Sequence, residues 1–257
     1  MNNQSLKSMY NKAFEDGAFF SFSGIEEMKG ILNQLDSWEG LDVLEIGCGT
    51  GRLCKMISLL GAKSVHGVDY SEKAIEIARE YPLENTVFEC LNYKNLPVYY
   101  KFDVVVMQGV LEHLDEPYKE LIDISKFLKP DGLIITSSPS FFNIRGIVWM
   151  TFELLLGVRM SIADLHQIDP FEISDVCAKN NLLILDMTSV DYDWGAGERT
   201  IIDFKKRFNS KIFQDKYQLK RENIDRFLKW FGVAITQMND EKQISGANII
   251  YKIKRLS

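Results

Sequence analysis

The feature that most constrains this chain is a regular alternation of short apolar runs and helical patterns. The apolar runs are rich in β-branched residues and bounded by turn residues, which is typical of buried β-strands. The segments between them repeat apolar residues at helical spacing. Such an alternation predicts an α/β fold with a mainly parallel sheet and helices on both faces. The strands are expected at residues 41–47, 61–71, 85–90, 102–108 and 132–138.

The second half of the chain departs from this alternation. An aromatic-rich insertion is expected at 139–170 and a charged, helical stretch at 198–242. Further strands at 182–192 and 247–253 would complete a Rossmann-like sheet of seven strands. We therefore expect a single domain over residues 1–257. Its expected parts are N-terminal cap helices at 1–40, a ligand-binding core at 41–138, and helical, aromatic lid insertions on the substrate side at 139–170 and 195–243.

The charge balance argues against a nucleic-acid partner. The formal net charge is -6, whereas a protein that binds a nucleic-acid backbone needs a surplus of Lys and Arg. A small-molecule substrate is the expectation that follows.

The cysteines argue against a metal site and against a disulfide framework. The four cysteines form no C-x-x-C pair, so neither a zinc site nor a set of disulfides is indicated. A reducing, cytoplasmic setting is expected. No apolar run reaches the roughly 18 residues of a membrane span, and no stable membrane association is expected.

The stretch "VLEIGCGTGRL" at 43–53 places glycines at 47, 49 and 51. A dinucleotide-binding G-x-G-x-x-G would need a glycine where Arg52 stands, and a phosphate-binding loop would need G-K-[ST]. Glu45 lies two residues before the first glycine. An acid there repels a pyrophosphate and attracts an ammonium group.

The segment from Glu45 to Gly51 resembles the first motif of the class I S-adenosylmethionine (SAM) dependent methyltransferases. The resemblance implies that Asp69, in "GVDYS", accepts the ribose hydroxyls. It implies that "CLNYKNLP" holds the adenine, with Asn92 where the family usually has Asp. The implied cofactor-binding residues are Glu45, Gly47, Cys48, Gly49, Gly51, Asp69, Tyr70, Asn92, Tyr93, Gln108 and Tyr10.

Two histidines are candidates for the chemical step, in which a base takes a proton from the acceptor. His113, in "LEHLDEP", follows the fourth strand, where the resemblance places it beside the transferred methyl group. An imidazole titrates near neutral pH, which suits a base. His166 follows the lid insertion and is the second candidate. Either one could instead brace its loop, and Asp115 and Asp169 are candidates to orient them.

The expected reaction is O-methylation of a sugar, nucleotide-sugar or similar polar metabolite. The acidic charge and the polar loop "DYDWGAGER" at 191–199 support this reading. The apolar stretch "IVWMTFELLLGV" at 147–158 favours an alternative acceptor, a quinone or lipid-like aromatic, because it would take up an apolar tail or touch a membrane surface. A SAM-binding regulator without catalysis is a further alternative. A homodimer is compatible with the sequence.

Overall fold

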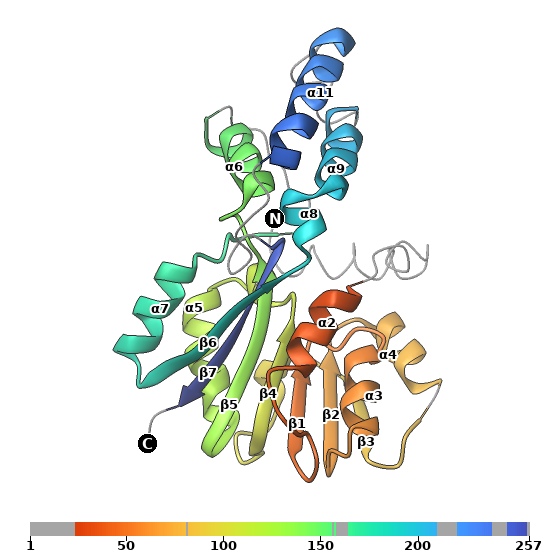
Figure 1. The fold of residues 1–257 in the computed structure, drawn as a ribbon. Coiled ribbons are helices and arrows are strands. Elements are labelled where there is room, and N and C mark those ends of the chain that lie inside the picture. The colour runs from red at the N-terminus through yellow and green to blue at the C-terminus, as the bar shows by residue number, and fades with distance from the viewer. Residues whose placement is uncertain are drawn as a thin grey trace. The chain divides into compact units, whose positions relative to one another are not determined.

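The computed structural model describes residues 24–80, 82–155, 157, 164–209, 220–237 and 246–255. Its seven strands form one sheet in the order β3-β2-β1-β4-β5-β7-β6 (Figure 1). The strands are β1 Asp42–Ile46, β2 Ser64–Asp69, β3 Thr86–Cys90, β4 Phe102–Gln108, β5 Leu128–Pro139, β6 Leu182–Val190 and β7 Asn248–Arg255.

The sheet confirms the Rossmann-like architecture predicted from the sequence. β1 pairs in parallel with β2 and β4, and the pairs β2–β3 and β4–β5 are also parallel. Figure 1 shows β7 running opposite to β5, so the sheet is mixed at that side. Parallel strands end at a common edge, and the carboxyl edge is where ligands bind in folds of this kind.

One strand begins earlier than predicted. Helix α5 (Pro117–Ile124) is followed by a short 3₁₀ turn, and β5 already pairs at Leu128 with Phe102. The register then shifts before Val104 pairs with Leu133. This irregularity accommodates Pro130, which has no N–H for a regular ladder.

Two helices of the alternating region show a local reason to form. In α4 (Glu72–Arg79), the Ser71 side chain accepts a hydrogen bond from the backbone N–H of Ala74, as expected of an N-cap. In α5 (Pro117–Ile124), proline occupies the first turn. The remaining elements are α2 Ile25–Leu32, α3 Arg52–Leu59, η2 Tyr93–Asn95, η3 Leu111–His113, η4 Ser125–Phe127, α6 Ile144–Met150, η5 Thr151–Leu155, α7 Pro170–Lys179, α8 Tyr192–Ala196, α9 Glu198–Phe208 and α11 Arg221–Gln237.

The described residues divide into two compact units. Unit 1 contains the described residues up to Ser138, the described residues of the segment Ala163–Met187, and the described residues from Ile250 onwards. Unit 2 takes in those from Pro139 to Ile162 and from Thr188 to Ile249. Unit 1 therefore contains the glycine-rich segment and both candidate histidines.

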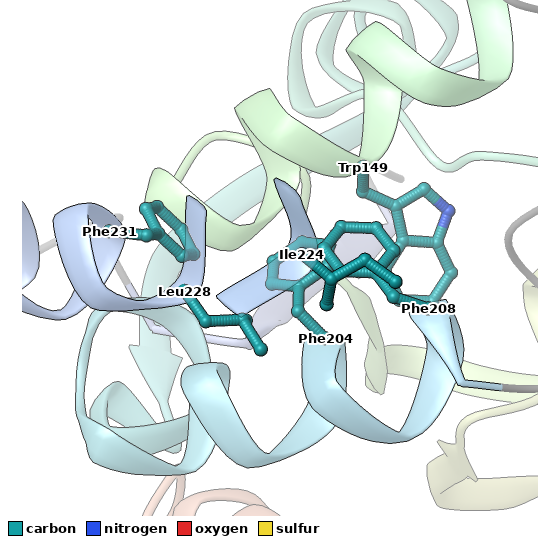
Figure 2. Close-up of a cluster of buried hydrophobic side chains, with 6 residues drawn as sticks. All are labelled: Trp149, Phe204, Phe208, Ile224, Leu228 and Phe231. Atoms are coloured by element: carbon teal, nitrogen blue, oxygen red, sulfur yellow. The ribbon is translucent and has the colours of Figure 1, made fainter. Parts of the chain in front are cut away.

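Unit 2 has its own aromatic core (Figure 2). Trp149 comes from α6, and the other members come from α9 and α11, so both segments expected to be insertions contribute to one cluster. The buried members are Trp149, Phe204, Phe208, Ile224, Leu228 and Phe231.

The apolar stretch that begins at Ile147 forms the end of α6 and the π-helical turn η5. Trp149 is buried, whereas Ile147 and Leu154 are exposed, so the stretch is only partly buried. In the part of the chain that the structure describes, no helix is long and apolar enough to cross a membrane.

Candidate functional site

The glycine loop, residues 47–51, requires glycine for two physical reasons. Gly47, Gly49 and Gly51 all have positive φ angles, of 71°, 51° and 73°, which side chains disfavour. A Cβ on Gly47 would also lie 2.6 Å from a Val110 methyl carbon, and one on Gly51 would lie 2.5 Å from the Phe88 ring. The loop is therefore packed closely against Val110 and Phe88, and it leaves no room for a side chain at Gly47 or Gly51.

Asp69, at the end of β2, fixes the shape of this loop. One carboxylate oxygen accepts a hydrogen bond from the backbone N–H of Gly49 at 2.9 Å, and the other accepts from the backbone N–H of Ser71 at 2.8 Å. Each oxygen has a further lone pair. The carboxylate is thus held in place beside the glycine loop, and its role in accepting the two ribose hydroxyls stays a prediction.

Glu45 lies beneath the glycine loop and is 3% exposed. Burial raises the pKa of Glu45 from 4.5 to about 8, although hydrogen bonds from Cys54 oppose the shift. Its Oε2 atom has no hydrogen-bond partner among the described residues. A buried acid with an unsatisfied oxygen suits a cationic ligand group, so the loop fits the ammonium group of SAM.

Three of the residues expected to bind the cofactor are engaged within the chain. Asn92 is exposed and caps η2 by accepting a hydrogen bond from the Lys94 backbone N–H. Tyr93 is buried, and its hydroxyl donates to Glu120 at 2.6 Å. Gln108, at the end of β4, donates to the Glu27 carboxylate at 3.0 Å. The cofactor roles of these three residues stay predictions.

Two further residues belong to the same prediction. Tyr70 follows Asp69 directly and is half-buried, and desolvation raises the pKa of its hydroxyl. Tyr10 lies outside the described residues. Their cofactor roles also stay predictions.

A second group of side chains gathers after β4 and is called the acid–histidine cluster here: Glu112, His113 and Asp164. Each offers one potential ligand atom, and these atoms lie within 4.8 Å of one another. His113 Nδ1 is 3.9 Å from Asp164 Oδ1, and both side chains are mostly buried. Asp164 therefore lies beside the Nδ1 edge of the His113 imidazole ring.

Hydrogen bonds to the side chain and to the backbone of Glu112 fix the geometry of the cluster. Its carboxylate accepts a hydrogen bond from the Ser138 hydroxyl at 2.9 Å. Its backbone carbonyl accepts from the N–H groups of Leu165 and His166 at 2.8 and 3.0 Å, which fastens residues 164–166 to the loop after β4. Burial raises the pKa of Glu112 well above its usual range, and the charge of Asp164 raises it further.

The glycine loop and the acid–histidine cluster lie at the same edge of the sheet. β1 and β4 are parallel neighbours, with Glu45 opposite Val106. Val110, which covers Gly47, comes just before the η3 turn that carries Glu112 and His113. The structure therefore brings the predicted cofactor loop and the predicted base together, as the carboxyl-edge argument requires.

Sequence reasoning missed Glu112 and Asp164 and chose other acids. Asp169 instead caps α7 by accepting hydrogen bonds from the N–H groups of Phe171 and Glu172. Asp115 is exposed. The available signal was the Glu-His pair in "LEHLDEP".

The imidazole and the carboxylates of the acid–histidine cluster are also a donor set that can hold a divalent cation, whereas the sequence predicted no metal.

His66, the third histidine, is paired elsewhere. It lies in β2, and its Nε2 contacts the Glu89 carboxylate of β3.

Comparisons with known proteins identify relatives of this chain. A family model described as a methyltransferase domain matches residues 38–190. The mitochondrial ubiquinone biosynthesis O-methyltransferase of Schizosaccharomyces pombe is 29% identical over 181 residues, which cover 66% of this chain and 65% of that protein. The enzyme of the same name from Neisseria meningitidis is 30% identical over 164 residues, which cover 60% of this chain and 68% of the relative. The chain thus matches about two thirds of the length of these curated relatives.

Solved structures share the fold. The mycolic acid cyclopropane synthase CmaA1, complexed with SAH and CTAB, superposes with a TM-score of 0.58 at 15% identity and covers 89% of this chain and 83% of its own.

The acceptor predicted from the sequence, a sugar or nucleotide-sugar, is wrong. The curated relatives are named for methylation in ubiquinone biosynthesis, and no carbohydrate modification is supported. The polar segment at 191–199 misled the prediction. It was expected to be a loop, but it forms α8 and the beginning of α9, and its charges serve internal contacts. Asp193 pairs with Arg199 at 3.1 Å, and Asp191 accepts a hydrogen bond from the Asn248 amide at 3.1 Å.

Proposed function

Because the chain belongs to the methyltransferase domain family, and is of its class I SAM-dependent type, we propose that it methylates a phenolic hydroxyl of a quinone precursor. SAM is the cofactor. The observation that carries the acceptor class is the naming of the curated relatives as ubiquinone biosynthesis O-methyltransferases. This acceptor was the alternative that the apolar stretch after residue 147 favoured.

When bound, SAM supplies the methyl group, and its sulfur takes the electrons of the broken C–S bond. The chain has to hold both reactants in line and remove one proton. Asp69 and the glycine loop perform the first task for the cofactor. His113 takes the hydroxyl proton on its Nε2 atom, as the acceptor oxygen forms its bond to the methyl carbon. Asp164, 3.9 Å from Nδ1, stabilises the imidazolium that results.

A phenol suits this arrangement. A phenolic hydroxyl has a pKa near 10, which is far lower than that of an aliphatic sugar hydroxyl. A neutral-pH base such as an imidazole therefore removes its proton at a smaller energetic cost. The acid–histidine cluster also offers a place for a cation that would bind two neighbouring hydroxyls of a catechol.

The proposal is tested with radiolabelled SAM and a catechol that carries a short prenyl chain. We expect methyl transfer to one catechol oxygen, and none to the matched dimethyl ether, which has no free hydroxyl. SAM binding is measured in parallel by calorimetry. Saturable SAM binding together with no transfer to any catechol would overturn the acceptor class and leave the family assignment intact.

A cytoplasmic location, the absence of a nucleic-acid partner and a homodimer stay predictions.

A further inference from the structure

Helix α11 in unit 2 carries apolar side chains on two different faces. Ile224, Leu228 and Phe231 are buried in the aromatic core with α6 and α9 (Figure 2). Phe227 lies at the border of this core, and Trp230 is 64% exposed. An exposed Trp is unusual beside a core that buries three other residues of the same helix. The second face therefore requires its own explanation.

The second face is a continuous stripe along the helix. Asn223, Arg226, Phe227 and Trp230 follow the spacing of three and four residues that aligns side chains on one side. Together with Lys229 they line a shallow depression of about 660 Å³. The Phe227 and Trp230 rings are 6.2 Å apart and inclined at 43°. These five residues are called the α11 stripe below.

The stripe is basic in a chain that is acidic overall. Among the described residues, Arg226 and Lys229 line it and no acidic residue does, whereas the chain has a net charge of -6. Lys220 and Arg221 are exposed at the beginning of the same helix. Glu222 and Asp225 are exposed on α11 as well but do not line the depression. Positive charge is thus concentrated around the two aromatic rings.

We propose that the α11 stripe is a docking surface for an anionic lipid bilayer. Trp and Phe favour the membrane interface, where an apolar ring is buried while its edge stays hydrated. Arg and Lys beside them attract anionic headgroups, by about 1 kcal/mol each. The depression lies on one helix and is shallow, which suits a broad surface better than a small anion, for which a concave site is needed.

The association is peripheral and reversible. One aromatic pair with a few basic residues gives weak binding that salt weakens further. It does not contradict the prediction of no stable membrane association. The proposal rests on α11 alone and stands whichever acceptor the site in unit 1 takes.

The test is flotation of the full-length protein with two kinds of vesicle, phosphatidylcholine alone and phosphatidylcholine mixed with phosphatidylglycerol. We expect binding to the anionic vesicles only, and its loss at high salt. Arg226→Glu with Lys229→Glu should lower the partition coefficient by at least about 25-fold, since each lost cation is worth about fivefold. Trp230→Ser should lower it about tenfold, because a large apolar side chain leaves the interface.

The matched control is Lys205→Glu with Lys206→Glu on α9. These two exposed lysines lie outside the stripe, and the double change alters the net charge by the same amount. It should change the partition coefficient by less than about twofold to threefold. Circular dichroism checks that all variants are folded.

Three outcomes would overturn the proposal. The first is no binding to anionic vesicles at low salt. The second is equal losses in the α11 and α9 double variants, which would indicate a nonspecific charge effect. The third is a concentration-dependent dimer that Trp230→Ser abolishes, which would assign the stripe to a second copy of the chain.

Discussion

The two ends of the same strands use carboxylates in opposite ways. At the amino edge of the sheet, Asp42 of β1 and Asp103 of β4 share Lys129, at 2.6 and 2.8 Å. Lys129 is the main cause that lowers the pKa of Asp42 from 3.8 to about 2. Three residues further along β1, burial raises the pKa of Glu45 to about 8. The single strand β1 therefore carries two acids that behave in opposite ways. The fold stabilises the charged form of Asp42 and destabilises the charged form of Glu45.

The difference indicates which edge serves structure and which serves a ligand. Asp42 is paired with a lysine of the same chain, so its negative charge is stabilised without any ligand. Glu45 and Glu112 are buried with raised pKa values, and a destabilised acid of this kind persists where function requires it. Changes at the carboxyl edge should therefore affect binding and turnover, and changes at the amino edge should affect only stability.

The largest expected effect follows from His113→Ala. Removing a general base lowers kcat by about 10² to 10⁴, while the affinity for SAM should stay within about twofold to threefold. Turnover is measured with the prenylated catechol, and affinity by calorimetry. His66→Ala is the control, because His66 lies within β2 and its side chain pairs with Glu89 rather than with the acid–histidine cluster, and kcat should be unaffected.

Treatment with a chelator separates two roles for the cluster. With a histidine base alone, removing divalent cations leaves kcat unchanged. Activity that is lost on chelation and restored by Mg²⁺ would instead assign Glu112, His113 and Asp164 to a cation. An unchanged kcat in His113→Ala would contradict both readings.

The second effect follows from Gly47→Ala, with Gly40→Ala as a matched control. Both glycines have similar positive φ angles, of 71° and 75°, so both variants carry the same backbone strain. Only the Gly47 variant places a Cβ 2.6 Å from a Val110 methyl carbon, and nothing lies within 4 Å at Gly40. Overpacking costs about 1 to 3 kcal/mol, so SAM affinity should fall about 30-fold in the Gly47 variant only.

A second substitution shows whether the clash is the cause. Val110→Ala removes the methyl carbons that the new Cβ would meet and should restore most of the affinity of Gly47→Ala. If the double variant binds as weakly as Gly47→Ala alone, backbone strain rather than close approach explains the glycine.

The sequence was sufficient for the sheet and the glycine loop, because both follow from local patterns. Apolar runs predict strands, and three glycines after the first strand predict a cradle. The beginning of β5 was not predictable in this way. Its register shift depends on how Leu128 and Leu133 meet β4, and that is a tertiary contact.

The acid–histidine cluster required the structure. Asp164 is about fifty residues from His113 in the sequence, and two hydrogen bonds to the Glu112 carbonyl bring it there. Asp169 resembled a better partner but is used as a helix cap. The acceptor was mispredicted for a similar reason, since the charges of residues 191–199 looked available and are paired within unit 2.

A smaller effect is expected from Glu45→Gln, and it depends on pH. In the free protein the pKa of Glu45 is about 8, so the acid is protonated at neutral pH. If it pairs with the SAM ammonium, binding releases that proton, and affinity rises with pH up to about 8. The variant should bind about tenfold more weakly near pH 7.5 and lack this rise. Calorimetry in two buffers of different ionisation enthalpy counts the released protons.

Stability gives an independent check on the same acid. A folded-state pKa above the unfolded value of 4.5 means that stability is full below 4.5 and is lost as the pH rises through 8. Glu45→Gln should remove this decline in urea unfolding of the free protein. Proton release that persists in the variant would show that another group is responsible.

The smallest effect is expected at the amino edge, from Asp42→Asn. The pKa of Asp42 is lowered from 3.8 to about 2, so its contribution is full above 3.8 and is lost as the pH falls through 2. The variant should lose about 1 kcal/mol of unfolding free energy at neutral pH, because solvent screens the pair, and should approach the wild type in acid. Urea unfolding at both pH values measures this. SAM affinity and kcat should not change, and a change in either would mean that the two edges of the sheet are coupled.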